Sequence, residues 1–261
     1  MDITTFEHKY ILETLTLGSA RMLTVFSVLP FVSSGSLENS TVRLALASVL
    51  SLPVIHLNYD IISHREDGTF LLFLVKEIVL GLLLGFLSAI PFWVLQGLGD
   101  LIDNQRGASM ADQMDGSLGA SASPLAILLN KYYMCLYFYL GGFFSFLLVV
   151  YKSYQVWPLF ELLPELSINT SIKILHLLDY LMESVILFAA PLVMSMFFVE
   201  FGLALINRFA QQLNVFVLAM PLKSITGMAV LYLYLPILAP YLFQQIENQR
   251  NLLTAIEGLL K

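Results

Sequence analysis

The feature that most constrains this chain is a series of six long apolar segments. A helix that crosses a bilayer needs about 20 mainly apolar residues, and all but the second segment reach that length. The segments are too long for strands and lack the two-residue alternation of a half-buried sheet. We therefore expect an all-α, membrane-associated fold. The segments span Ile11–Val32, Val42–Leu57, Phe70–Leu95, Leu125–Tyr151, Ile172–Leu205 and Val215–Phe243.

The composition separates the chain from soluble domains and from nucleic-acid-binding proteins. Hydrophobic residues make up 58% and charged residues 12% of the 261 positions, whereas soluble domains average roughly 45–50% and 25%. The 13 basic residues are spread thinly and the net charge is −6, which is unlike the basic footprint of a nucleic-acid-binding protein. We expect a membrane partner and no nucleic acid.

Proline recurs inside the apolar segments. An interior proline removes one backbone hydrogen bond and costs about 3 kcal/mol in an ordinary helix. The carbonyl that it frees needs a partner in neighbouring protein, because lipid provides none. The sequence therefore predicts bent or broken helices that pack against other helices. The prolines are Pro53, Pro91, Pro191, Pro221, Pro236 and Pro240.

Small and charged residues within the apolar segments indicate the same kind of packing. Gly81 and Gly85 give one helix a face of small residues that another helix can approach closely. We interpret this face as ordinary helix packing rather than as the contact of a specific dimer. A charge at mid-bilayer costs between roughly 2.5 and 17 kcal/mol, so it normally faces a partner or water. We predict subunit contacts for Lys76, Glu77, Gly81, Gly85, Glu200, Asn207, Arg208 and Lys223.

A polar segment, DNQRGASMADQMDGSLGASASP, runs from Asp103 to Pro124 and interrupts the apolar chain. Its glycines and serines allow a flexible backbone. Irregular backbone at membrane depth is tolerated only where protein encloses it or where it lines an aqueous cavity, and Met110 and Met114 offer adaptable apolar contacts. Two interpretations stay open from the residues: a movable plug inside a channel, or a solvated connector between helices.

Arg106 stands near the start of this polar segment. We expect it to anchor the start of the segment, with Asp103 or Asp100 as its partner. The alternative is an ordinary ion pair at a helix end.

The sequence contains no recognisable catalytic or metal-binding constellation. The histidines His8, His56, His64 and His176 are scattered, and none pairs with a second at metal-ligand spacing. There is no phosphate-binding loop and no dinucleotide-binding glycine fingerprint. We expect no catalytic residues, no metal and no cofactor, and a protein that is not an enzyme.

Two long motifs resemble a known family. KEIVLGLLLGFLSAIPFWVLQGLGDLIDNQRGA (Lys76–Ala108) and EFGLALINRFAQQLNVFVLAMPLKS (Glu200–Ser224) are similar to the signature blocks of the FliR/SpaR/YscT (SctT) family. Members of that family are integral subunits of the export apparatus in flagellar and virulence type III secretion systems. The residues DNQRGA and NVFVLAMPLKS are more similar to the virulence branch than to the flagellar one.

The resemblance implies an assembly in the bacterial inner membrane, at the base of the secretion apparatus. One copy of the chain would join SctR-type and SctS-type subunits in a helical ring of bent helical hairpins. An SctU-type switch protein and an SctV-type export protein are the further expected partners. Residues 1–175 would form an SctR-like part, and residues 176–261 an SctS-like hairpin.

The resemblance also implies a function, that of an export-gate subunit. The subunit would help form the channel for unfolded secreted proteins, with a plug loop near residues 103–124 that keeps it closed. The alternatives are a small-molecule transporter, which an inverted repeat would favour, and a purely structural nucleator of the ring. No inverted repeat is recognisable. The residues assigned to the plug are Arg106, Gly107, Ser109, Met110, Asp112, Gln113, Met114, Asp115 and Gly116.

Overall fold

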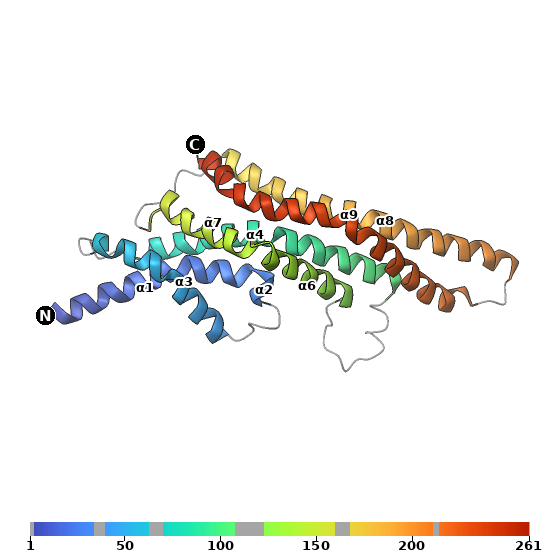
Figure 1. Cartoon of the computed structure of the whole chain (residues 1–261), viewed down its shortest axis with the longest axis horizontal. Coiled ribbons are helices and arrows are strands. Elements are labelled where there is room, and N and C mark those ends of the chain that lie inside the picture. Colours follow the sequence, from blue (N-terminus) through green and yellow to red (C-terminus); the bar gives the residue numbers. More distant parts are fainter. Residues whose placement is uncertain are drawn as a thin grey trace. The chain divides into compact units, whose positions relative to one another are not determined.

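The computed structural model describes residues 3–33, 40–62, 70–107, 123–159, 168–210 and 214–260 (Figure 1). Within these ranges the secondary structure consists of eight α-helices and no strand, which confirms the predicted all-α fold. The helices are α1 (Ile3–Val28), α2 (Pro30–Ser33), α3 (Ser40–Ile62), α4 (Phe70–Arg106), α6 (Pro124–Tyr139), α7 (Gly142–Val156), α8 (Ile168–Phe209) and α9 (Val215–Leu260).

Local sequence sets three of the helix ends. α4 ends where Gly107 adopts a left-handed conformation with a φ of 78°, which glycine tolerates because it has no Cβ. α6 begins directly after its N-cap residue, Ser123, whose hydroxyl accepts a hydrogen bond from the Ala126 amide at 3.3 Å. Pro124 occupies the first helical position, where the N–H that it lacks would have had no helical partner. Gly141, with a φ of 73°, separates α6 from α7.

All six prolines named above lie inside helices that continue on both sides of them. Pro53 is in α3, Pro91 in α4 and Pro191 in α8, and α9 contains Pro221 and two more. None of the six ends a helix, so the helices are not broken at these positions, and a bend at each proline stays a prediction.

The chain folds into two compact units, each assembled from separate stretches of sequence. The first unit comprises Met1–Ile90, Gly141–Ile174 and Glu247–Lys261, and the second comprises Pro91–Leu140 and Leu175–Ile246. The long helix α4 therefore contributes its first half to the first unit and its second half to the second.

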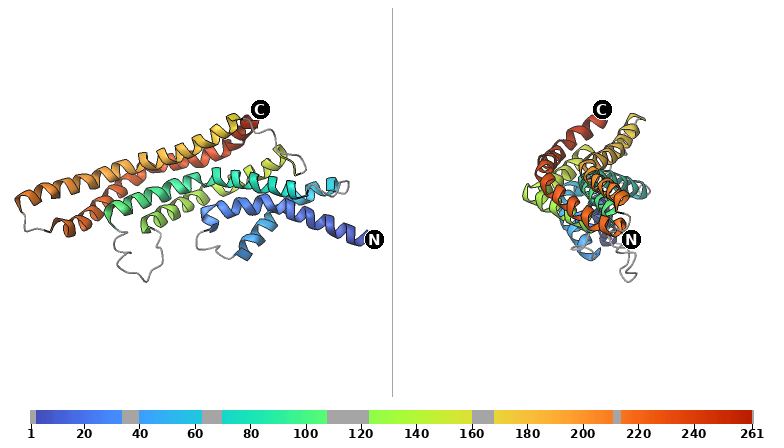
Figure 2. Two further views of the ribbon diagram at one scale, coloured as in Figure 1. Left: turned by 180° about the vertical axis from the view of Figure 1, so that it is seen from behind. Right: turned by 90° about the vertical axis from the view of Figure 1, so that its right-hand side faces the viewer.

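In the first unit, α1 packs against α3, against the first half of α4 and against α7 (Figures 1 and 2). The rings of Phe26 on α1 and Phe146 on α7 meet edge to face, with centroids 6.1 Å apart. The buried apolar residues of α1, α4 and α7 form a core that includes Leu17, Met22, Val25, Phe26, Phe73, Leu80, Leu84, Phe146, Val149 and Val150.

The small face of α4 is the surface that contacts α1. A Cβ atom at Gly81 would lie 2.7 Å from the Arg21 carbonyl oxygen, and one at Gly85 would lie 3.0 Å from the Val28 Cβ. Since any larger residue would push the helices apart, the two glycines permit this close approach. The predicted close helix packing is confirmed, and the partner helix belongs to the same chain.

In the second unit, the second half of α4 lies beside α6, and α8 and α9 run antiparallel as a long hairpin (Figures 1 and 2). The ring of Phe92 on α4 packs edge-on against Tyr133 and Tyr137 of α6, with centroids 4.6 and 5.3 Å apart. A Cβ atom at Gly99 would lie 2.3 Å from the Cα of Ala126. The backbones of α4 and α6 are therefore in contact one turn before the polar segment begins.

Three helical stretches are long and apolar enough to cross a membrane: Phe70–Arg106, Asp179–Phe209 and Val217–Glu247. α6 and α7, which are bent relative to each other, pass the same test as a pair and would make a fourth. The apolar stretches Leu15–Val28 and Thr41–Val54 are shorter. By length and composition, the described helices thus provide three or four candidate spans from the six apolar segments of the sequence.

Candidate functional site

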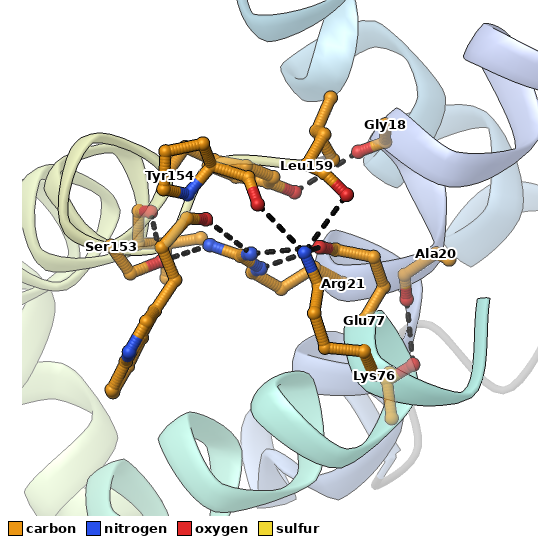
Figure 3. A network of polar contacts seen from close by, with 12 residues as sticks. Gly18, Ala20, Arg21, Lys76, Glu77, Ser153, Tyr154 and Leu159 are labelled. Atoms are coloured by element: carbon orange, nitrogen blue, oxygen red, sulfur yellow. Dashed lines mark hydrogen bonds and ion pairs between the residues drawn. The ribbon is translucent and has the colours of Figure 1, made fainter. Parts of the chain in front are cut away.

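A cluster of charged side chains lies in the core of the first unit (Figure 3). Arg21 of α1 donates to both carboxylate oxygens of Glu77 of α4, from Nε at 2.7 Å and from Nη2 at 2.9 Å. The Nζ of Lys76 lies 2.9 Å from the Oε1 of Glu77. Arg21 and Glu77 are fully buried and Lys76 is 3% exposed. We name these three residues the buried charge cluster.

The buried charge cluster has two cations and one carboxylate, so its cations need further acceptors. The backbone that follows α7 provides them. Arg21 donates to the carbonyl oxygen of Trp157 at 2.9 Å. Lys76 donates to the carbonyl oxygens of Pro158 and Leu159 at 2.7 and 2.9 Å. Charge-assisted hydrogen bonds of this kind are stronger than those between neutral groups, and here they fix the end of α7 against α1 and α4.

Two side chains of α7 enclose the cluster further (Figure 3). The Oγ of Ser153 accepts a hydrogen bond from Arg21 at 3.0 Å. The ring of Tyr154 lies with its centroid 4.0 Å from the Arg21 guanidinium carbon, and its hydroxyl donates to the Gly18 carbonyl oxygen at 3.0 Å. Protein groups therefore surround the charges, and the cluster is a structural joint of three helices.

A second polar cluster joins the ends of α4 and α6 in the second unit. Asp103, in the last turn of α4, is 3% exposed and accepts three hydrogen bonds. Arg106 Nε donates to its Oδ1 at 2.5 Å, and the backbone amide of Leu125 donates to its Oδ2 at 2.8 Å. The Ser123 hydroxyl donates to the same Oδ2. We name these four residues the loop root, because they flank residues 108–122.

The loop root also contacts α9. Arg106 Nη1 donates to the Ser224 hydroxyl at 3.3 Å, although the two residues are 118 positions apart in the sequence. A Cβ atom at Gly107 would lie 3.6 Å from the Cγ of Met220. Because Arg106 and Gly107 come from the first sequence motif and Met220 and Ser224 from the second, the two motifs meet at the loop root.

Two of the residues assigned to the plug are described: Arg106, which belongs to the loop root, and Gly107, which follows it. Arg106 forms its ion pair with Asp103, one of the two partners expected from the sequence. Gly107 ends α4 beside it. The other assigned residues lie outside the described ranges: Ser109, Met110, Asp112, Gln113, Met114, Asp115 and Gly116.

The residues predicted to contact other subunits fall into a buried group and a surface group. The buried group lies inside the first unit, against α1 and α7 of the same chain: Lys76, Glu77, Gly81 and Gly85. The surface group lies on α8 and α9: Glu200, Asn207, Arg208 and Lys223. Lys223 Nζ lies 2.7 Å from the Oε2 of Glu200 and so pairs these two helices. The contacts described for the buried group lie within the chain, and contact with another subunit stays a prediction for all eight residues.

Arg21 and Ser123 belong to these clusters, yet sequence reasoning did not single them out. Arg21 is a basic residue within an apolar segment, which signals that a partner is buried with it. Ser123 before proline is a helix-start signal. Neither signal identifies a partner, because Glu77 is 56 residues from Arg21 and such a contact depends on the tertiary fold.

Neither cluster has the composition of a metal site. The central carboxylates, Glu77 and Asp103, are already held by cations or hydrogen-bond donors. In the part of the chain that the structure describes, no group of three or more His, Cys, Asp or Glu residues could hold a metal ion. The chemistry of both clusters is that of joining helices.

Comparison with known proteins identifies the family. The model of the family described as bacterial export proteins, family 1, matches residues 12–249 of the chain. The chain is 37% identical over 226 residues to Yop proteins translocation protein T of Yersinia pestis, covering 85% of each chain. It is 32% identical over 231 residues to the surface presentation of antigens protein SpaR of Salmonella typhimurium, covering 88% of this chain and 85% of SpaR.

Identity is lower with a flagellar relative. The flagellar biosynthetic protein FliR of Buchnera aphidicola is 24% identical over 234 residues, covering 87% of each chain. The chain belongs to the bacterial export proteins of family 1, the FliR/SpaR/YscT family, and is closer to its virulence-type branch than to its flagellar branch.

Proposed function

We propose that this protein is an export-gate subunit of a type III protein secretion system. With sister subunits it forms the channel through which unfolded secreted proteins leave, in the bacterial inner membrane at the base of the apparatus. The plug loop, residues 103–124, keeps the channel closed until the machine is engaged. Support comes from the relatives, whose names refer to translocation, surface presentation and flagellar biosynthesis.

The observation that carries the proposal is that one buried carboxylate binds both flanks of residues 108–122. Asp103 pairs with Arg106 before these residues and accepts hydrogen bonds from Ser123 and Leu125 after them. A solvated connector does not need a buried charged anchor that joins its two ends. A plug that moves aside and returns does need fixed ends, because they restrict where the intervening chain can go.

The surface of the α8–α9 hairpin supports assembly with other proteins. Phe198, Phe209 and Tyr232 are 63%, 88% and 77% exposed in this single chain. Glu200 and Arg208 are exposed on the same hairpin. Charges within so apolar a surface favour a protein neighbour over lipid, which cannot solvate them.

The proposed neighbours follow from the family resemblance. SctR-type and SctS-type subunits form the ring around this chain, and the SctU-type and SctV-type proteins adjoin it. Residues 1–175 are the SctR-like part of the chain and residues 176–261 the SctS-like part, which contains α9 and α8 from residue 176 onward.

Deletion of Ser109–Ser121 tests the plug. We expect the export complex to form in normal yield, because the deleted residues follow α4 and precede α6 in the sequence and belong to neither helix. Leak of small ions and small molecules across the membrane should rise, since the channel loses its obstruction. Cells that lack the whole complex supply the baseline for leak. Unchanged leak with a normal yield of complex would contradict the plug assignment.

Crosslinking separates a gate from a scaffold. A photoreactive residue at Met110 or Met114 should crosslink to a secretion substrate stalled in the channel, because the plug lies beside the passing chain. The same reactive residue at Tyr139, which is 86% exposed on α6, is a control for position. Absence of substrate crosslinks at both methionines, with the complex intact, would favour a structural nucleator of the ring.

A further inference from the structure

The two helices of the α8–α9 hairpin are joined by polar contacts at two widely separated levels. At one level, the hydroxyls of Tyr180 and Tyr241 form a hydrogen bond, and the Gln245 amide donates to the Tyr180 hydroxyl. At the other, Lys223 Nζ lies 2.7 Å from Glu200 Oε2. We name the first set the tyrosine contact and the second the charged contact. We propose that these two contacts together fix the register of α8 along α9.

The contacts along the hairpin agree on a single register. Between the two polar levels, a Cβ atom at Gly227 of α9 would lie 3.1 Å from the Sδ of Met196 of α8. The charged contact lies one turn further along both helices, at Glu200 and Lys223. The tyrosine contact lies about four turns away in the other direction on both helices. The register is thus the same at three levels.

Apolar packing by itself does not define this register. Between the two polar levels the rings of Phe188 and Tyr241 have their centroids 4.4 Å apart. Apolar attraction is non-directional, and a slide of one helical turn, about 5.4 Å, brings a similar row of side chains into place. Hydrogen bonds and ion pairs require a narrow range of distances, so the same slide breaks them. Buried apolar side chains of this stretch include Leu192, Met196, Leu231 and Leu238.

The charged contact discriminates between registers more strongly than the tyrosine contact. The residues one turn from Glu200 on α8 are Met196 and Ala204, so a slide in either direction brings an uncharged residue to Lys223. The Lys223 side chain is only 13% exposed, and a charge enclosed without a partner is costly. In the tyrosine contact, Gln245 already donates to Tyr180 and can keep that bond after a slide in one direction.

The test measures the register by crosslinking in the full export complex in its membrane. Met196→Cys with Gly227→Cys reports the observed register, because these positions are in contact. Leu192→Cys with Gly227→Cys, and Met196→Cys with Leu231→Cys, report a slide of one turn in opposite directions. Cys135, which is exposed, is replaced by serine throughout so that it forms no crosslink. The measured quantity is the ratio of shifted to in-register crosslinks.

Two variants remove the polar contacts. Tyr180→Phe removes the hydroxyl and keeps the ring, and Lys223→Met removes the ammonium group and keeps a long side chain. Polar contacts between membrane helices are individually weak, so the two variants together should raise the ratio about tenfold, with the larger part from Lys223→Met. Tyr232→Phe is the matched control, because that tyrosine is 77% exposed on α9, and it should leave the ratio unchanged. An unchanged ratio in the combined variant would overturn the inference.

An exchange of charges separates a register effect from a general loss of folding if the combined variant gives a low yield. Glu200→Lys with Lys223→Glu restores an ion pair and should return the ratio to that of the unmodified chain, whereas Lys223→Met alone should raise it. No increase in Lys223→Met, or an increased ratio in the exchanged pair, rejects the charged contact as a determinant of the register. These results are independent of the proposed function, because the crosslinks lie within one chain and report the register whether or not the chain is a gate.

Discussion

The buried charge cluster and the loop root both place a carboxylate between helices, but they differ in what surrounds it. Glu77 lies between two cations, and those cations use their remaining donors on the backbone after α7. Asp103 has one cation, one hydroxyl and one amide as partners, and its cation is partly exposed. Both carboxylates are buried, so the difference lies in the partners.

This difference indicates how readily each joint can change. At Glu77 any loss of contact leaves at least one charge in the core without compensation, which favours a joint that does not open. At Asp103, water can solvate the Arg106 guanidinium if the ion pair separates, and the other two partners are neutral. We name the Glu77 cluster the permanent joint; separation at the loop root would leave one buried charge, that of Asp103, without its cation.

The largest expected effect is that of Glu77→Gln in the permanent joint. Removal of the only carboxylate leaves the Arg21 and Lys76 cations buried without an anion, and such a loss destabilises a protein by about 3–5 kcal/mol. The melting temperature and the yield of the purified export complex should both fall. Glu200→Gln, at a surface position, is the matched control. If the Glu77→Gln complex has the same melting temperature as the unmodified complex, the backbone carbonyls alone compensate the two cations.

A smaller effect is expected from Gly99→Ala beside the loop root. The added Cβ would meet the α6 backbone at 2.3 Å, and overpacking of this kind typically costs about 1–3 kcal/mol. Gly202→Ala in α8 is the control, because nothing lies within 4 Å of a Cβ there and alanine favours a helix. Gly99→Ala should lower the melting temperature of the complex, whereas Gly202→Ala should leave it unchanged or raise it. Equal melting temperatures would show that α4 and α6 separate without cost.

The smallest effect on stability is expected at the pair of Glu200 and Lys223. The carboxylate side chain is 58% exposed, and surface ion pairs contribute about 0–1 kcal/mol. Glu200→Gln should therefore barely change the melting of the complex. Charge reversal, Glu200→Lys or Arg208→Glu, should instead reduce recovery of the complex with its partners, if these residues contact sister subunits. Normal recovery together with blocked secretion would place them in the conduction path.

Sequence reasoning identified several parts of these sites. The helices and the two candidate partners of Arg106, Asp103 and Asp100, followed from local patterns, because apolar length and charge spacing depend on near neighbours. The structure decided for Asp103. The close packing at Gly81 and Gly85 was also expected, but the identity of the partner helix was not. The sequence indicated that Lys76 and Glu77 need partners. It did not identify Arg21, a residue of another apolar segment, as the cation that pairs with Glu77.

By itself, the sequence determined the all-α class, the membrane association and the family, because composition, apolar length and two long motifs are properties of contiguous residues. Only the tertiary structure decided that Arg21 pairs with Glu77, that Ser123 and Leu125 join Asp103, and that the two motifs meet at Arg106 and Ser224. These contacts connect residues that are 20 to 118 positions apart. The physical reason is that helix packing chooses which buried polar groups lie within hydrogen-bond distance, and no local pattern encodes that choice.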